Sequence, residues 1–168
     1  HLLAALLRPS NIDVAAGALD EIRRIIERIR QAWPRTQILL RADSGFARDE
    51  LMAWCAANRV DYVFGLARNP RLVAELEADL AGAAAEHAAT GQPVRRFKEF
   101  RYATLDSWSC ARRVIGKAEH LAKGPNPRFI VTSLSASAID GQPLYEGVYC
   151  ARGEMENRIK EQQLHLFA

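Results

Sequence analysis

Two acidic residues, far apart in the sequence, stand where a carboxylate can do chemistry. Asp43 follows the run Ile-Leu-Leu-Arg-Ala at 38–42, and Glu156 lies in a segment with the pattern of a helix. The aliphatic run predicts a strand buried on both faces, and the carboxyl end of such a strand is where an open α/β sheet presents its chemistry. Gly45 then allows a sharp turn. The alternative is that Asp43 only caps the next helix.

The segment 144–166 is expected to be the last helix of the chain. Arg152 and Glu156 lie three and seven residues after Tyr149, so the three side chains share one stripe of this helix. Lys160 continues the stripe. One face therefore presents a carboxylate with a basic residue a turn before and a turn after it. The alternative is a solvated helix on which these charges form ordinary salt bridges.

The elements that must position these residues alternate in type through the first part of the chain. Apolar residues at helical spacing predict a long amphipathic helix that Pro34 ends. The alternation predicts an α/β sheet with short connections. The expected elements are a strand at 2–7, a helix at 14–33, a strand at 38–42, a helix at 48–58 and a strand at 61–66.

The second part of the chain has a different character. Leu72, Leu76 and Leu80 form one stripe of a helix expected from Pro70 to about His87. Three β-rich runs follow, the first two joined near residue 106, and then a linker. This block resembles a β-rich insertion in an α/β domain. Its expected strands are 94–105, 107–117 and 128–134, and its linker is 135–143.

Composition excludes several classes of protein. The 168 residues, 49% hydrophobic and 26% charged, are enough for one globular domain with a core. No apolar run approaches the ~18 residues of a membrane span. Three scattered cysteines and four histidines without metal-ligand spacing argue against a disulfide framework or a zinc site, and suit a reducing cytoplasm. The chain opens inside an apolar run at 2–7, so we expect a fragment of a longer protein.

Positive charge is concentrated in one segment. The net charge is +3, but residues 94–128 hold nine Lys or Arg against three acids, which leaves the rest of the chain negative. A local surplus of this kind suggests a polyanionic partner. The basic residues of this segment are Arg95, Arg96, Lys98, Arg101, Arg112, Arg113, Lys117, Lys123 and Arg128.

The spacing Tyr149-x2-Arg152-x3-Glu156 resembles part of the Tyr-Arg-Glu-Lys signature of bacterial insertion-sequence transposases with a DDE catalytic domain. Segments 39–46, 58–62 and 149–161 resemble the same family, and the similarity extends along the whole chain. It implies a ribonuclease-H-like α/β fold: a mixed sheet with helices on both faces and a β-rich insertion before the last helix. Residues 1–168 would be a partial catalytic domain, with its core at 1–69 and 143–168 and the insertion at about 70–142.

The resemblance also implies a catalytic triad of two aspartates and a glutamate. Asp43 would be the second acid and Glu156 the third, and both would be metal ligands for two Mg²⁺ or Mn²⁺ ions. The first aspartate would lie upstream of the chain, so we expect the fragment alone to be inactive. Hard cations prefer carboxylate oxygens, which is why missing His and Cys clusters do not argue against a metal enzyme.

The function that the resemblance implies is DNA transposition by metal-dependent phosphodiester hydrolysis and strand transfer at transposon ends. The implied partners are transposon and target DNA and a second copy of the protein. The implied location is the bacterial cytoplasm, at the nucleoid and away from membranes. Gln163 stands where the signature lysine is expected, and Lys160 is its candidate substitute. The alternative is a non-catalytic DNA-binding or assembly module. A phosphatase-like hydrolase would need a Gly-rich loop or a nucleophilic cysteine after a strand, and neither is found. The expected DNA contacts are Tyr149, Arg152, Lys160, Arg95, Arg96, Arg112 and Arg113.

Overall fold

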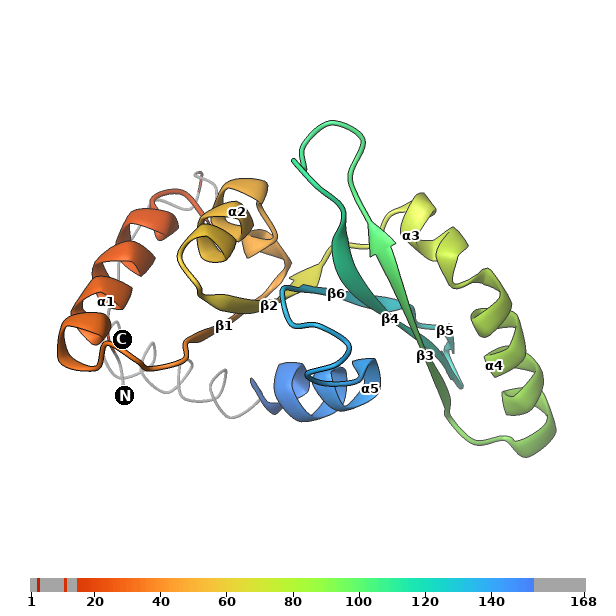
Figure 1. Cartoon of the computed structure of the whole chain (residues 1–168). Helices are drawn as coiled ribbons and strands as arrows, with labels where there is room; N and C mark the ends of the chain where they lie inside the picture. The colour runs from red at the N-terminus through yellow and green to blue at the C-terminus, as the bar shows by residue number, and fades with distance from the viewer. Residues whose placement is uncertain (1–2, 4–10, 12–14, 153–168) are drawn as a thin grey trace.

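The computed structural model describes residues 3, 11 and 15–152 (Figure 1). Its first half alternates helices and strands, as the apolar periodicity predicts. The expected strand at 2–7 lies outside the described residues apart from Leu3. The elements of this half are α1 (Ala18–Ala32), β1 (Leu39–Ala42), the 3-10 turn η1 (Ser44–Phe46), α2 (Asp49–Ala57) and β2 (Asp61–Leu66).

The second half begins with two helices, continues with four strands and ends in a helical segment. The final segment changes its winding twice, from a short α-helical turn to a π-helix and then to a 3-10 turn. These elements are α3 (Pro70–Glu75), α4 (Glu77–Thr90), β3 (Val94–Tyr102), β4 (Arg112–Leu121), β5 (Gly124–Pro125), β6 (Arg128–Thr132), α5 (Gly141–Pro143), η2 (Leu144–Tyr149) and η3 (Cys150–Arg152).

The strands form one mixed sheet in the order β1-β2-β6-β4-β3, with β5 paired to β4. β1 and β2 are parallel and all other pairs are antiparallel. The strands expected in the β-rich block therefore extend the same sheet, because β6 pairs directly with β2. The predicted mixed α/β class is confirmed.

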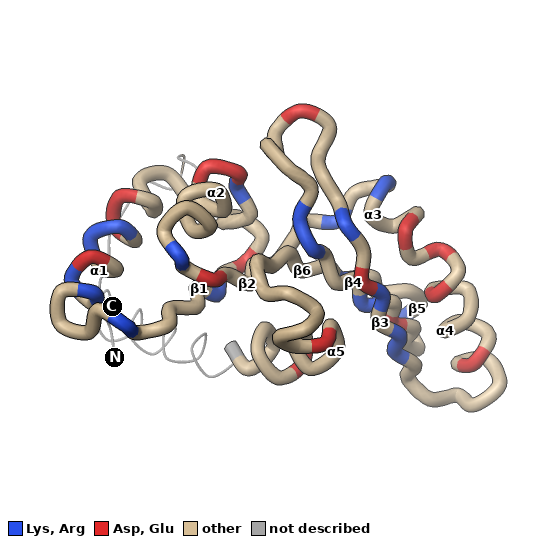
Figure 2. The backbone as a smooth tube through the Cα atoms, in the orientation of Figure 1, with Lys and Arg blue, Asp and Glu red and all other residues tan. Residues whose placement is uncertain are grey.

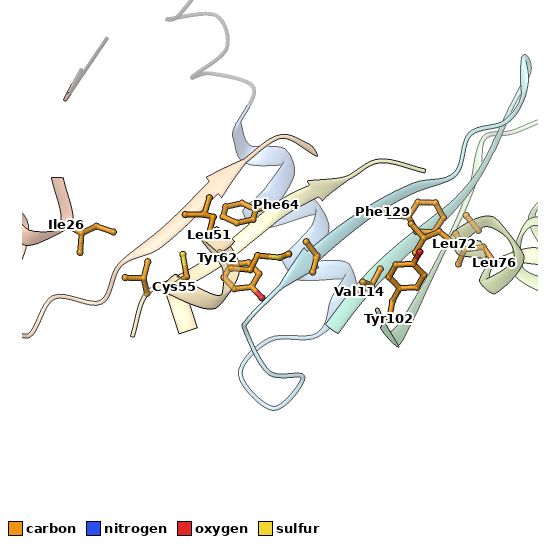
Figure 3. Close-up of a cluster of buried hydrophobic side chains, with 14 residues drawn as sticks. Ile26, Leu51, Cys55, Tyr62, Phe64, Leu72, Leu76, Tyr102, Val114 and Phe129 are labelled. Atoms are coloured by element: carbon orange, nitrogen blue, oxygen red, sulfur yellow. The ribbon is translucent and has the colours of Figure 1, made fainter. Parts of the chain in front are cut away.

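Helices cover both faces of the sheet (Figure 1). On one face, side chains from α1, α2, α3 and the α3–α4 junction pack with strand residues such as Tyr62, Phe64 and Val131 into the larger core (Figure 3). On the other face, Leu144 and Tyr145 of η2 pack on Val63, Ile115 and Ile130. Successive strand residues point to opposite faces, so each buried strand contributes to both clusters.

Strand β1 differs from the expectation of a strand buried on both faces. It lies at one end of the sheet among the described strands, and Leu39 is 40% exposed. The prediction of burial on both faces is wrong for these residues. Three aliphatic side chains in a row do not show whether their strand lies in the middle or at the end of a sheet.

Two other elements have different bounds from those expected. The single helix expected at 70–87 is divided at Leu76, which is fully buried and packs against Gly116 of β4. β4 begins at Arg112, not at Ser107. The hydroxyl oxygen of Thr104 accepts hydrogen bonds from the backbone N–H groups of Ser107 and Trp108, so this stretch forms a loop.

Candidate active site

Asp43 lies directly after β1, at the end of the sheet where the parallel strands β1 and β2 both terminate. Its Oδ1 accepts a hydrogen bond of 2.9 Å from the backbone N–H of Gly45, which caps the turn η1. The residue is exposed, and Oδ2 has no hydrogen-bond partner within residues 15–152. The side chain thus caps a turn and also presents a carboxylate oxygen to solvent.

Tyr149, over a hundred residues later in the chain, reaches the same turn. A Cβ atom built on Gly65 of β2 would lie 2.6 Å from the Tyr149 hydroxyl, 3.0 Å from the backbone N of Ser44 and 3.3 Å from the carbonyl carbon of Asp43. These atoms therefore surround one point on β2. The first residue of the Tyr-Arg-Glu stripe and the turn that carries Asp43 lie together because position 65 has no side chain.

A second contact fixes the helical segment at this place. Arg41, two residues before Asp43, donates a hydrogen bond of 2.5 Å from Nη1 to the backbone carbonyl of Val148. The Tyr145 and Tyr149 rings lie 5.8 Å apart, and Tyr145 is buried against the sheet. Strand β1 is thus joined to the start of the Tyr-Arg-Glu stripe by a hydrogen bond.

The remaining residues of the stripe are less fully described. The backbone of Arg152 ends η3, but its side chain is not described. Glu156, Lys160 and Gln163 lie outside the described residues. The assignment of Glu156 as the third acid stays a prediction. So does the assignment of Lys160 as the substitute for the signature lysine, whose expected position is occupied by Gln163.

The sheet register separates the basic residues of the 94–128 segment along the strands. Ala42, next to Asp43, lies in a row that continues through Phe64, Val131 and Val114 to Phe100. The rows beyond it, toward the carboxyl ends of β1 and β2, hold Arg95, Arg96, Lys117 and Arg128, whereas Arg101, Arg112 and Arg113 lie toward the opposite end.

Arg95 and Arg96 point to opposite faces of β3. Arg95 lies on the face of η2, where its Nε donates to Glu119 over 2.6 Å and its Nη1 lies 3.7 Å from Glu146. Arg96 lies against Gly82 of α4 and pairs with Glu86 at 3.2 Å. Both side chains are about half exposed, at 54% and 42%. Of these two arginines, only Arg95 shares a face with Tyr149.

Arg112 is not placed as a surface contact for DNA would be. It is 6% exposed, and it donates to Asp49 over 2.6 Å and to the Tyr62 hydroxyl over 3.2 Å. Burial of the Asp49 carboxyl works against its ionisation, but hydrogen bonds from Arg112 and Ser109 hold its pKa below the usual value. The charge of Arg112 is thus used inside the fold.

Arg113 is also buried, at 8% exposure. Its guanidinium pairs with Glu99 at 2.6 Å and donates to two backbone carbonyls of the segment that follows β6. Burial and pairing therefore give no support to the expectation that Arg112 and Arg113 contact DNA. A sequence read without tertiary structure shows only their charge.

Much of the segment's surplus charge is balanced by acids from outside it. Lys98 pairs with Glu75 of α3, at 3.5 Å, and Arg96 pairs with Glu86 of α4. Figure 2 shows the acidic positions of α3 and α4 beside the basic positions of β3 and β4. The local surplus read from the sequence is therefore larger than the surplus on the folded surface.

Sequence reasoning did not single out Arg128. It begins β6, pairs with Lys117 in the sheet register, and is exposed. Its Nε donates to the Asn126 side chain over 3.2 Å, and it has no acidic partner within residues 15–152. Alternation from Ile130 places it on the face of η2. Arg128 is placed on this face by the pairing of β6 with β2 and β4, and the sequence alone does not show that pairing.

The described residues contain no cluster of three or more His, Cys, Asp and Glu side chains that could hold a metal ion. Cys55 is buried, and desolvation raises the pKa of its thiol to about 12. Cys110 and Cys150 are exposed and free. Asp43 is thus the residue of the predicted metal site that the structure describes, and it supplies one open carboxylate oxygen.

Comparison with protein families decides what kind of domain carries this arrangement. The family model of the transposase DDE domain, group 1, matches residues 1–168. The chain belongs to the transposase DDE domain family. A search of curated proteins found no match for it.

Membership in the DDE transposase family places the chain in DNA transposition, with DNA as the partner and with nuclease and transferase activity in full-length members. The resemblance to this family read from the sequence is confirmed, while the Tyr-Arg-Glu-Lys branch stays a prediction. Within the described residues, no helix of this DDE domain is both long and apolar enough to cross a membrane.

Proposed function

We propose that this DDE domain takes part in cutting a phosphodiester bond at the ends of an insertion sequence and joining the freed 3′-hydroxyl to target DNA. Asp43 and Glu156 are the proposed catalytic carboxylates and metal ligands. Two Mg²⁺ or Mn²⁺ ions would activate the attacking oxygen and stabilise the leaving oxygen.

One observation carries this proposal: the Tyr149 hydroxyl and the backbone of Asp43 and Ser44 meet over Gly65. Asp43 and the Tyr-Arg-Glu stripe were connected only by resemblance to a family signature. A contact between the start of the stripe and the Asp43 turn supports a shared site. On the helix that the sequence predicts, Glu156 occupies the same stripe as Tyr149.

The donor chemistry of Asp43 fits the proposed ions. Mg²⁺ and Mn²⁺ prefer oxygen ligands, and Asp43 is an exposed residue whose Oδ1 is held by the Gly45 N–H while Oδ2 has no hydrogen-bond partner within residues 15–152. That hydrogen bond fixes the orientation of the carboxylate, as a backbone donor behind a metal ligand commonly does. Glu156 would supply the second carboxylate from the helical segment.

For the DNA backbone we propose contacts on the face that carries Tyr149. Arg128 and Arg95 lie on that face and toward the same end of the sheet as Asp43. Arg152 would bind a phosphate near the bond to be cut, and Lys160 would take the part of the signature lysine. Arg96 would contact DNA only along the α4 side.

Two of the three expected carboxylates are assigned within these 168 residues. We therefore propose that this chain by itself binds metal and DNA but does not cleave DNA. The active complex would contain two copies, each bringing one transposon end, and would act at the nucleoid in the bacterial cytoplasm.

The test measures Mn²⁺ binding by the 168-residue chain, with the electron paramagnetic resonance signal of free Mn²⁺ as the readout. Asp43→Asn and Glu156→Gln are each expected to weaken binding at least about tenfold, because each removes a charged oxygen ligand. Asp106→Asn is the matched control, since Asp106 is an exposed carboxylate on the β3–β4 loop. Equal binding by all four proteins would overturn the metal site and favour a non-catalytic DNA-binding module.

A further inference from the structure

Glu99 of β3 and Arg113 of β4 form an ion pair that reaches beyond the sheet. Nη2 of Arg113 lies 2.6 Å from Oε2 of Glu99, and Nε of Arg113 donates to the same oxygen over 2.8 Å. The Arg113 side chain is 10% exposed and the Glu99 side chain 35%, so the guanidinium is largely removed from water and the carboxylate is partly buried. Such a pair is strengthened by geometry that satisfies the remaining donors and acceptors.

The remaining donors of Arg113 hold the chain that leaves the sheet. Nη1 donates to the backbone carbonyl of Leu134 and Nη2 to that of Ile139, each over 2.9 Å. These two carbonyls bracket the segment between β6 and α5. One guanidinium thus fixes both ends of this connection against β4.

The remaining oxygen of Glu99 holds the first residue of the helical segment. Oε1 accepts a hydrogen bond of 2.6 Å from the backbone N–H of Gly141, the first residue of α5. A Cβ atom at position 141 would lie only 2.7 Å from this oxygen. Glycine therefore lets the backbone approach the carboxylate closely enough to donate.

From Gly141 the chain continues without a break into η2 and on to Tyr149. Leu144, fully buried, and Tyr145 dock on the sheet, and Arg41 then holds the carbonyl of Val148. The origin and the far end of this helical segment are thus each hydrogen-bonded to a strand. A shift at Gly141 would move Tyr149 away from Gly65.

We propose that Glu99 and Arg113 are positioning residues, which set where the helix of the third acid starts and so bring its stripe to Asp43. We call Glu99, Arg113 and Gly141 the helix clasp. The two side chains of the clasp come from β3 and β4, the strands expected as part of an insertion, so this part of the sheet orients the catalytic helix as well as offering charge to DNA. This inference rests on the proposed function for its catalytic meaning, while its structural content stands on the contacts alone.

The test compares Glu99→Ala, Glu99→Gln and Arg113→Lys with wild type in the 168-residue chain. Glu99→Gln keeps an oxygen for the Gly141 N–H, so it is the variant most certain to fold. Glu86→Gln is the matched control: Glu86 lies on α4, not on α5, and pairs with Arg96 of β3 at 3.2 Å. Two quantities are measured, amide hydrogen exchange by peptide and Mn²⁺ affinity.

We expect exchange of peptides within 141–152 to rise about tenfold in Glu99→Ala and Arg113→Lys, and less in Glu99→Gln, while β2 peptides keep wild-type exchange. Mn²⁺ affinity should likewise fall about tenfold in Glu99→Ala and Arg113→Lys and less in Glu99→Gln, as it does when a group supporting a metal ligand is lost. Glu86→Gln should change neither quantity.

Unchanged exchange in 141–152, or an equal rise across β2 and the helical segment, would overturn the clasp. The first result would mean that the contacts do not hold the segment, and the second that they only stabilise the whole fold. If wild type shows no Asp43-dependent Mn²⁺ binding, the proposed metal site fails, and the exchange measurement still decides the clasp separately.

Discussion

The hydroxyl of Tyr149 occupies the space that a side chain at Gly65 would fill. This relationship joins β2 to the helical segment that leads to Glu156, and it lies beside the Asp43 turn. A glycine inside a strand weakens the strand, and it often marks a place where another group approaches the backbone closely. Here the approaching groups are Tyr149 and the backbone of Ser44, so Gly65 belongs to the architecture of the site.

Gly65→Ala is therefore expected to destabilise the protein by about 1–3 kcal/mol, because its Cβ would meet the Tyr149 hydroxyl and the Ser44 amide. Urea unfolding measures the loss. In the double variant with Tyr149→Phe, part of the loss should be recovered, since the hydroxyl is gone. We expect a coupling of at least about 0.5 kcal/mol.

Gly147→Ala provides the control for this measurement. A Cβ at position 147 meets nothing within 4 Å, and the residue lies in η2 with an exposed surface. It should leave stability unchanged or raise it by up to about 1 kcal/mol. If Gly65→Ala behaved like Gly147→Ala, Tyr149 would not be held against β2.

Arg128→Gln should weaken DNA binding without weakening the fold. Arg128 is exposed, and its loss would leave one phosphate contact fewer, so the slope of log affinity against log salt should fall by about one. Fluorescence anisotropy of a labelled duplex at several salt concentrations measures it. Arg28→Gln, which removes an exposed arginine of α1, is the control and should leave the slope unchanged. Equal slopes for both variants would exclude Arg128 from the DNA path.

The sequence predicts the elements around Asp43 well, because their signals are local. The apolar spacing of 14–33 corresponds to α1, which begins at Ala18, and the β-branched and aromatic run at 61–66 corresponds to β2. Asp43 itself was identified from a strand followed by an acid, a serine and a glycine. Local patterns of this kind need no knowledge of the partner strands.

What the sequence does not predict depends on distant partners. Arg112 looked like part of a basic surface, yet its partner Asp49 lies 63 residues away and takes it into the core. The position of Arg128 on the Tyr149 face follows only from the pairing of β6 with β2 and β4. Charge in a sequence gives sign and density, whereas the sheet register decides which charges reach the surface.

Arg112→Met should act on stability and not on DNA binding. Removing the guanidinium would leave Asp49 and the Tyr62 hydroxyl without their buried donor, which we expect to cost about 3 kcal/mol. Urea unfolding measures the loss, and the salt dependence of DNA binding by the folded protein should stay as in wild type. Arg101→Gln, at an exposed position of β3, should cost less than about 1 kcal/mol. A changed salt slope in Arg112→Met would return this residue to the DNA surface.

The lowered pKa of Glu119 predicts how the stability of the protein depends on pH. Glu119 is 3% exposed, and although burial opposes its charge, hydrogen bonds from Lys117, Arg95 and Asn126 hold its pKa below the usual value. The unfolded chain therefore binds a proton at higher pH than the folded protein does. The stability that Glu119 contributes is fully present above its unfolded pKa of about 4.3, and is lost as pH falls through the lower folded value.

Glu119→Gln should accordingly be less stable than wild type by about 2 kcal/mol at pH 7, because Lys117 would lose its charged partner inside the fold. The difference should narrow below about pH 4.3, where wild type also loses the charge. Urea unfolding at pH 7, 5, 4 and 3 measures it, with Glu86→Gln as an exposed ion-pair control that should differ little from wild type at any pH. A difference that stayed constant down to pH 3 would mean that Glu119 stabilises the protein through packing and not through its charge.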